Sequence, residues 1–298
     1  MLENAGAHIL VPRERDTQSN EVIIDNDSQH DSPYYREITD SPEQSWLTGD
    51  TPGFAIGTPP YTGNENPFKL GTWKKFQTND SLNASIEWIP EIPESGDYFV
   101  SIAYTAADTH ASDAHYTVFH VGGKTEFAVN QRIGGSTWIY LGQFHFKKGY
   151  FPDTQKVVLS TVSDDSAAWI SADAVRFGGG MGNIARGGET SGRPRFTEAA
   201  RYYMQFAGIP DTLVYNITEA FDDYTDDYRS RGEWVNYLRG APFGPNKNRE
   251  EKGLGIPVDL SLAFHTDAGI TRTDTTIGTL AIYSSMGGDT TRLFQVGS

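Results

Sequence analysis

The sequence predicts an α+β multidomain protein, with an antiparallel β-sandwich inserted in, or adjacent to, a partial α/β domain. Residues 96–177 contain short runs of alternating apolar residues, separated by Gly, Asp, Asn or Lys-Gly turns and with no helical stretch between them. This pattern is typical of an antiparallel sandwich. After residue 178, segments of helical period alternate with short apolar runs, which indicates an α/β sheet.

The run GDYFVSIAY illustrates the alternation within one expected strand. Val100, Ile102 and Tyr104 lie on one face, and Phe99 and Ser101 lie on the other. Sandwiches with such strands are often binding modules attached to enzymes, so catalytic residues are expected elsewhere in the chain.

The length of 298 residues leaves room for about two domains. We expect residues 1–30 to be an N-terminal piece of the α/β domain and 34–178 to be the sandwich. Residues 179–192 form a Gly-rich linker, and 193–298 form the remainder of the α/β domain. A strand expected at 7–11 would pair with the later strands, which makes the sandwich an insertion; a tandem arrangement is the alternative.

The α/β elements follow one another in regular order. Apolar residues recur at helical spacing over 195–208, and the segment 222–240 begins with aspartates and ends in Arg-Gly, as helices often do. Short strands are expected at 211–215 and over the apolar run that begins at 258.

Composition excludes several classes of function. The chain has 24 Lys and Arg against 39 Asp and Glu, a formal net charge of −15, which argues against nucleic acid or an anionic membrane as the main partner. It has no cysteine, so it has no disulfide, no thiol nucleophile and no Cys-based zinc site. No apolar run is long enough for a transmembrane segment.

The two ends of the chain indicate a fragment. The N-terminus lacks the features of a signal peptide and reads as the last turn of a helix followed by a strand. The C-terminus stops without a closing element. We therefore expect a longer protein, whose signal peptide would lie upstream.

The sandwich segment carries the hallmarks of a known family. NQRIGGSTWIYLGQFHFKKG is followed by ISADAVRFG, and the hallmark positions in them are Asn130, Gln131, Trp138, Leu141, Gly142, Gly149 and 172–177. These residues resemble the golvesin/xanthan-lyase-type carbohydrate-binding-like domain. The resemblance implies a peptidoglycan or extracellular polysaccharide partner, and a secreted, periplasmic or cell-surface protein.

The α/β part resembles the zinc-dependent N-acetylmuramoyl-L-alanine amidases in three segments, GAHILVPRERD, RSRGEWVN and DLSLAFHTDAG. The resemblance implies an amidase-like domain and substrate-binding roles for Arg13, Arg231 and Asn236. Pro12 stands where the family has Thr, and Trp234 with the residue after it replaces small residues. As a whole the chain resembles Bacteroidetes proteins labelled xanthan lyase or amidase.

His265 is the predicted chemical centre. A His at the C-terminal end of a central strand lies where α/β ligand sites form, and catalytic zinc uses three protein ligands plus a water that it activates. Asp267 would orient the imidazole or contact substrate, and Glu198 is a candidate second ligand. The alternatives are a structural His and a Glu198 paired with Arg201 in a helix. The family's other ligands would precede Met1, so the zinc site is expected to be incomplete.

Other candidates concern metals and sugar stacking. His110, His115 and His120 are spaced by five residues, which suits neither one helix face nor one strand face. Trp46 and Trp73 lie in Gly-, Pro- and Thr-rich loops, and we expect them to be exposed for stacking on sugar rings.

The sequence therefore predicts a fragment of a secreted cell-wall or polysaccharide-active protein, with a carbohydrate-binding-like module and part of a zinc-dependent amidase-like hydrolase. A non-catalytic glycan-binding module is the first alternative. The second is a xanthan-lyase-type polysaccharide lyase, which would need a base and a positive subsite; the sequence shows no basic cluster.

Overall fold

The computed structural model describes residues 6–27, 33–40, 44–59, 61–78, 84–179, 199–219, 221–240, 242, 244–248 and 250–263. The chain divides into two units, 1–259 and 260–298, and the description of the second ends at residue 263. No helix among these residues is both long and apolar enough to cross a membrane.

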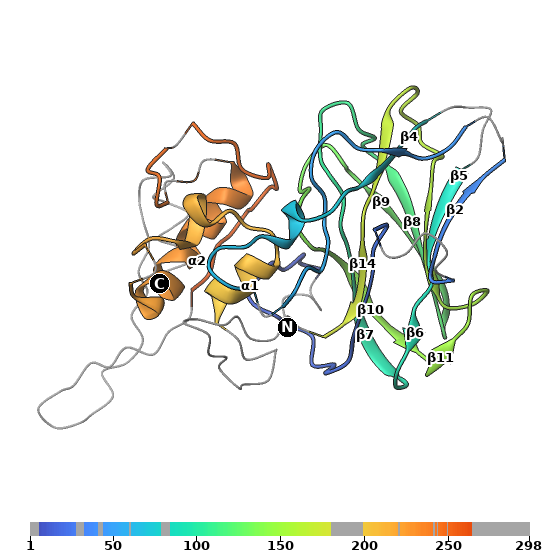
Figure 1. The fold of residues 1–298 in the computed structure, drawn as a ribbon, viewed down its shortest axis with the longest axis horizontal. Helices are drawn as coiled ribbons and strands as arrows, with labels where there is room; N and C mark the ends of the chain where they lie inside the picture. The colour runs from blue at the N-terminus through green and yellow to red at the C-terminus, as the bar shows by residue number, and fades with distance from the viewer. Residues whose placement is uncertain are drawn as a thin grey trace, which may run out of the picture. The chain divides into compact units, whose positions relative to one another are not determined.

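Two antiparallel sheets form the sandwich (Figure 1). The four-stranded sheet has the order β1 (Glu21–Ile24), β14 (Val175–Gly178), β7 (Gly96–Ile102) and β10 (Ile139–Phe146). The five-stranded sheet has the order β2 (Tyr35–Thr39), β5 (Ala84–Trp88), β12 (Lys156–Ser160), β8 (Ala114–His120) and β9 (Gly123–Val129). Two small sheets join β13 (Trp169–Ala172), β4 (Lys74–Gln77) and β3 (Leu47–Thr48), and β11 (Gly149–Tyr150) with β6 (Glu91–Ile92).

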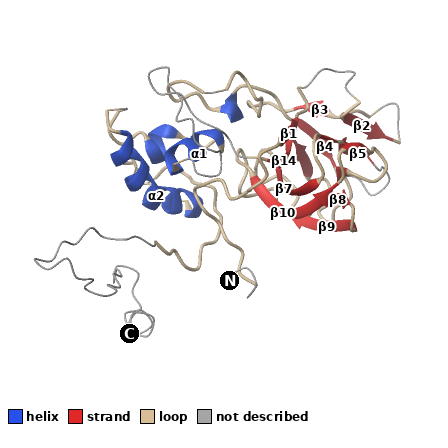
Figure 2. Ribbon diagram, turned by 90° about the horizontal axis from the view of Figure 1, so that it is seen from below, coloured by secondary structure: helices blue, strands red, loops and turns tan. Residues whose placement is uncertain are grey.

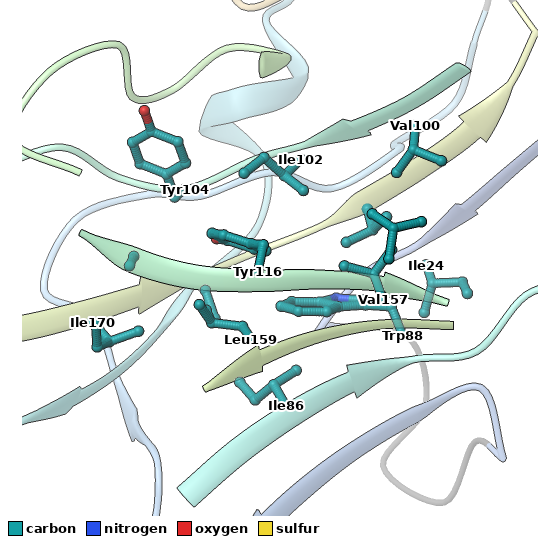
Figure 3. Packing of buried hydrophobic residues seen from close by; sticks show 14 of the residues in the cluster. Ile24, Ile86, Trp88, Val100, Ile102, Tyr104, Tyr116, Val157, Leu159 and Ile170 are labelled. Carbon is teal, nitrogen blue, oxygen red and sulfur yellow. The ribbon is translucent and has the colours of Figure 1, made fainter. Parts of the chain in front are cut away.

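The core of the sandwich follows from strand alternation. Val100 and Ile102 of β7 are fully buried and face Trp88 of β5 and Val157 and Leu159 of β12, which belong to the same apolar cluster (Figure 3). Since each buried side chain of this size stabilises the fold by about 1.5–3 kcal/mol, a one-residue slip of β7 would be costly. The predicted alternation of this strand and the predicted sandwich are confirmed.

The opposite face of the four-stranded sheet is also covered. Helix α1 (Ala200–Phe206), a π-helical turn η4 (Asp211–Tyr215) and helix α2 (Asp223–Arg239) pack together, and α1 lies beside α2 (Figure 2). A 3-10 turn, η2 (Pro67–Lys69), contributes Phe68 to the same second apolar cluster.

Trp138 connects the sandwich to this helical part. Its ring lies 4.8 Å from Phe54, 5.4 Å from Phe68 and 5.9 Å from Phe206, measured between ring centroids. Phe206 is the last residue of α1. Trp138 is therefore a packing residue, and it is buried.

Both predicted helices form. The Asp222 side chain caps α2 by accepting from the backbone N–H groups of Tyr224 and Thr225, and Gly240 ends the helix at φ 121°. Gly208 follows α1 at φ 77°, where a Cβ atom would lie 2.5 Å from Phe68. Glycine is required there both for its backbone conformation and for this close approach.

The predicted α/β sheet does not form in the described residues. The segment 7–11 is not a strand; instead, the carbonyl of Ile9 accepts a hydrogen bond from Arg15. The N-terminal strand that does form is β1, and it pairs with β14 of the sandwich rather than with later strands.

The later expected strands also differ. Residues 211–215 form the π-helical turn instead of the expected strand. A short apolar run can be buried by either element, so the apolar pattern alone does not distinguish them. The described residues 258–263 contain no strand, and Leu260 is 64% exposed rather than buried in a sheet.

Candidate functional site

A cavity of about 340 Å³ lies between the outer face of the four-stranded sheet, the segment 8–15 and the helical part. Its walls come from β7, the end of β9, β10, β14, α1 and α2. Its volume is at the lower end of the roughly 300–1,000 Å³ typical of small-molecule sites. His8 and Arg13 line it and are exposed, so the cavity opens to solvent at this segment.

Strand alternation places the sheet residues of the cavity. Phe99 and Ser101 point away from the sandwich core, because Val100 and Ile102 point into it. On β10, a β-bulge between Tyr140 and Gly142 breaks the register with β7. Bulges change the direction of side chains, and both Tyr140 and the residue after it line the cavity.

Arg15 is held against an aromatic pair. Its guanidinium carbon lies 5.6 Å from the ring centroid of Phe99 and 5.2 Å from that of Tyr140, within the range of cation–π attraction. One of its nitrogens also donates a 2.9 Å hydrogen bond to the carbonyl of Ile9. The side chain is therefore fixed in place at the cavity wall.

Arg176 is the centre of a buried ion-pair network beneath the cavity. It contacts the carboxylates of Glu14 and Glu21, the latter at 3.1 Å, and its guanidinium lies 5.1 Å from the ring of Phe206. Burial acts to lower the pKa of Arg176, but Glu14 and Glu21 outweigh it and raise the pKa. Burial also raises the pKa of Tyr203, which lines the cavity above this network, to about 12.

Glu14 is fully engaged by the fold. One carboxylate oxygen accepts from the backbone N–H groups of Arg15, at 2.9 Å, and Asp16, at 2.8 Å, and the other oxygen contacts Arg176. Glu14 thus attaches the segment 8–15 to β14 and so holds this wall of the cavity in place.

The loop that closes the cavity is fixed from two sides. The hydroxyl of Tyr104 donates a 2.8 Å hydrogen bond to the carbonyl of Ile133. The backbone N–H of Gly134 donates to the carbonyl of Leu254, at 3.0 Å. This part of the cavity is therefore largely preformed.

Of the predicted substrate-binding residues on the described chain, Arg13 lies at the cavity. Arg231 and Asn236 lie on α2 and do not line it. Arg231 forms an ion pair with Asp227 one turn earlier, and Asn236 donates to Glu233 at 3.2 Å. These two side chains are thus engaged in contacts within their own helix.

Trp46 and Trp73 are buried, at 4% and 5% exposure, which contradicts the expected exposure for sugar stacking. Trp46 packs on Phe76 with ring centroids 5.3 Å apart, inside the sandwich core. Trp73 donates its indole N–H to the Thr51 hydroxyl at 3.0 Å. A large aromatic ring in a loop is often buried, because its burial contributes strongly to the stability of the folded state.

The predicted zinc residues His265, Asp267 and Glu198 lie outside the described residues. Within the described part of the chain, no group of three His, Cys, Asp or Glu side chains is arranged to hold a metal ion.

The three histidines of the sandwich have separate surroundings. The ring of His110 donates to the carbonyl of Thr105 at 2.8 Å, and burial lowers its pKa. His115 lies 3.6 Å from Asp113, whereas His120 lies 3.1 Å from the hydroxyl of Thr125.

Two buried carboxylates, Asp25 and Asp173, lie after β1 and before β14, and the exposed Asp27 lies near them. Burial raises the pKa of Asp25 to about 7 and that of Asp173 well above its usual range, and the charge of Asp25 raises the pKa of Asp173 further. Asp173 accepts from the backbone N–H of Phe54 at 2.9 Å, and Asp27 accepts from the Thr72 hydroxyl at 2.6 Å. These carboxylates connect the strand ends to the loops around residues 54 and 72.

The sequence reasoning missed most of the cavity. Phe99 carries a signal that could have been used, because it is an aromatic residue on the strand face that does not enter the sandwich core. Arg15 and Arg176 carry no such signal, because they are 161 positions apart and meet only in the folded chain.

Comparison with known proteins finds similarities over the sandwich. Residues 61–179, which run from η2 through β14, match the family model of the golvesin C-terminal domain. A curated relative, xanthan lyase of Bacillus sp. (strain GL1), is 27% identical over 123 residues, which is 37% of this chain and 13% of that protein. The matched segment is thus a small part of xanthan lyase, and these two findings support a golvesin/xanthan-lyase-type domain in the sandwich.

Two solved structures match part of this chain at low TM-score. Xanthan lyase of Paenibacillus is 22% identical, with a TM-score of 0.40 over 53% of this chain and 13% of its own. A family 35 carbohydrate binding module from Clostridium thermocellum is 15% identical, with a TM-score of 0.28 over 53% of this chain and 98% of its own.

Proposed function

We propose that this chain contributes a non-catalytic saccharide-binding module, and that the cavity over β7 and β10 is its binding site. The observation that carries the proposal is the set of partly accessible aromatic rings, Phe99, Phe127 and Tyr140, beside charged and hydroxyl groups at one preformed cavity. Sugars present C–H faces that pack on aromatic rings and hydroxyls that need polar partners.

The surroundings of Glu14, the acidic residue of the cavity lining, support binding rather than catalysis. Glu14 is the carboxylate of the cavity lining, and its two oxygens are engaged by backbone N–H groups and by Arg176. A general acid or base must be able to exchange a proton with the substrate, and a carboxylate held in this way serves the fold.

Affinity measurements on a panel of polysaccharides test the proposal. We expect the chain to bind at least one of peptidoglycan, xanthan and plant cell-wall polysaccharides, and Tyr140→Ala to reduce the affinity about tenfold, the loss of one aromatic stacking contact. The matched control is Tyr224→Ala, an exposed tyrosine on α2 that does not line the cavity.

Three results would count against this function. Unchanged binding in Tyr140→Ala with loss in Tyr224→Ala would move the site to α2. Equal losses in both variants would indicate non-specific adsorption. No binding to any saccharide would reject the module as a glycan binder.

The same proposal places the protein outside the cytoplasm, as a secreted, periplasmic or cell-surface part of a longer polysaccharide-active protein. Cell fractionation of the natural gene product tests it; recovery in the cytoplasm would contradict it.

The zinc-dependent amidase-like activity stays a prediction. We expect a full-length gene product to bind about one zinc ion and to lose it with His265→Ala. Glu198→Gln and Asp267→Asn separate the second ligand from a residue that orients the imidazole, since the first would weaken zinc binding more than the second. A full-length protein without zinc would reject the hydrolase assignment and leave the binding module unaffected.

A further inference from the structure

Much of the cavity wall is apolar. Trp138, Ile209 and Leu238 line it, and each of them is more than nine-tenths buried. They come from three parts of the chain: the residue before β10, the turn after α1, and α2. Burying a polar group without a partner costs free energy, so an occupant of this part of the cavity must present apolar surface.

Two hydroxyl side chains of the lining are buried and unpaired. Ser101 is 8% exposed and Thr137 is 7% exposed. Neither hydroxyl has a hydrogen-bond partner within the described part of the chain. Buried hydroxyls normally have such a partner, and its absence is unfavourable. A ligand with polar atoms of its own would supply the missing hydrogen bonds.

Ser101 lies in the middle of a row of three strands. In register, it is opposite Tyr140 of β10 on one side and opposite Arg176 of β14 on the other. Side chains that are directly opposite one another on neighbouring strands lie on the same face of the sheet. The guanidinium of Arg176 is engaged by Glu14 and Glu21, so the group of this row that is left for a ligand is the Ser101 hydroxyl.

Tyr203 of α1 adds a third hydroxyl to the lining. The charges of Glu14 and Arg176 both act on it, which places it near the same row. Its hydroxyl forms no hydrogen bond with any described residue. Burial raises the pKa of Tyr203 to about 12, so the hydroxyl keeps its proton at neutral pH and can donate it to an acceptor. The Ser101 hydroxyl can either donate or accept.

We infer that the cavity binds the acetamido group of an N-acetylated amino sugar, with the methyl against the apolar wall and the amide beside Ser101 and Tyr203. This inference rests on the proposed glycan-binding function and names the class of its ligand. An acetamido group brings one N–H donor and one carbonyl acceptor on a small apolar body. A sugar hydroxyl in its place would bring no apolar surface, and a plain acyl chain would leave the cavity hydroxyls unpaired.

The test compares oligosaccharides that share one backbone and one linkage but differ in a single substituent. Chitohexaose carries an acetamido group on every ring, and cellohexaose carries a hydroxyl in its place. A glycan strand of peptidoglycan, freed of its peptides, is the second acetamido ligand. In calorimetric titrations, we expect at least one acetamido ligand to bind at least about tenfold more tightly than cellohexaose. Which of the two binds more tightly distinguishes chitin from the bacterial wall as the source.

Variants then assign the effect to the cavity. Ser101→Ala and Tyr203→Phe each remove one hydroxyl and no hydrogen bond of the fold, so both variants should fold. We expect each to weaken binding of the acetamido ligand about tenfold and to weaken binding of cellohexaose less. The matched control is Ser85→Ala, because Ser85 is a partly buried serine of β5, in the other sheet and outside the cavity lining.

The outcomes separate this inference from the proposed function. If cellohexaose binds as tightly as both acetamido ligands, the inference is overturned and the glycan-binding function stands. The same holds if another saccharide binds while neither acetamido ligand does. Unchanged affinity in both cavity variants, or an equal loss in Ser101→Ala and Ser85→Ala, would also overturn the inference. Absence of binding to every saccharide would reject the function and the inference together.

Discussion

Asp25, which directly follows β1, gives a pH dependence that can be worked out from the structure. Burial raises the pKa of Asp25 from 3.8 to about 7. A carboxyl whose pKa rises on folding stabilises the folded state in its protonated form. Its contribution is complete below about pH 4 and is lost as the pH rises through about 7.

The size of this effect follows from the shift. A change of one pKa unit corresponds to about 1.4 kcal/mol, so Asp25 lowers the free energy of unfolding by at most about 4 kcal/mol between pH 4 and pH 8. The variant Asp25→Asn cannot ionise at this position. We therefore expect it to match the natural protein near pH 4 and to be more stable near pH 8, by up to about 4 kcal/mol.

Urea unfolding followed by tryptophan fluorescence, from about pH 4 to about pH 8, measures this difference. EDTA is present throughout, so that bound cations do not neutralise the carboxylates. The control Asp108→Asn changes an exposed aspartate and should retain the pH dependence of the natural protein. The reasoning is refuted if Asp25→Asn keeps the full slope, or if it is less stable than the natural protein at pH 8.

Three further predictions concern the connection between the sandwich and the helical part. Trp138→Ala should lower the free energy of unfolding by about 3–5 kcal/mol, because it empties the space between the two parts; a loss under about 1 kcal/mol in urea unfolding would contradict this. Gly208→Ala should cost at least about 1–2 kcal/mol, since alanine at φ 77° is strained and its Cβ would meet Phe68; an unchanged melting temperature would show that α1 shifts freely. Arg176→Met should cost about 3–5 kcal/mol, and adding Glu14→Gln should recover part of it by removing a buried unpaired charge; a double variant no more stable than the single one would reject the ion-pair account.

The sandwich could be predicted because its signal is local. Alternation in strands such as β7 fixes which side chains enter the core, and turn residues fix where strands end. Helix α2 could be predicted for the same reason, since its Asp222 cap and Gly240 stop are adjacent to it in sequence.

Within the described residues, the strands expected at 7–11 and 211–215 do not form, and the local signal of the second is ambiguous. The apolar run 211–215 is as compatible with a buried helical turn as with a strand, and the π-helical turn is what packs. The prediction that Trp46 and Trp73 are exposed was wrong for a related reason. A loop sequence does not reveal whether the loop folds back over an aromatic ring.

The sequence by itself determined the sandwich, the two helices, the golvesin-type hallmarks and the excess of negative charge. Only the tertiary structure decided that β1 joins the sandwich, that Trp138 connects it to the helical part, and that Arg13, Arg15 and Arg176 meet at one cavity. The physical reason is that hydrophobic period and capping act between neighbours in sequence, whereas a cavity is formed by residues that burial brings together from distant parts of the chain.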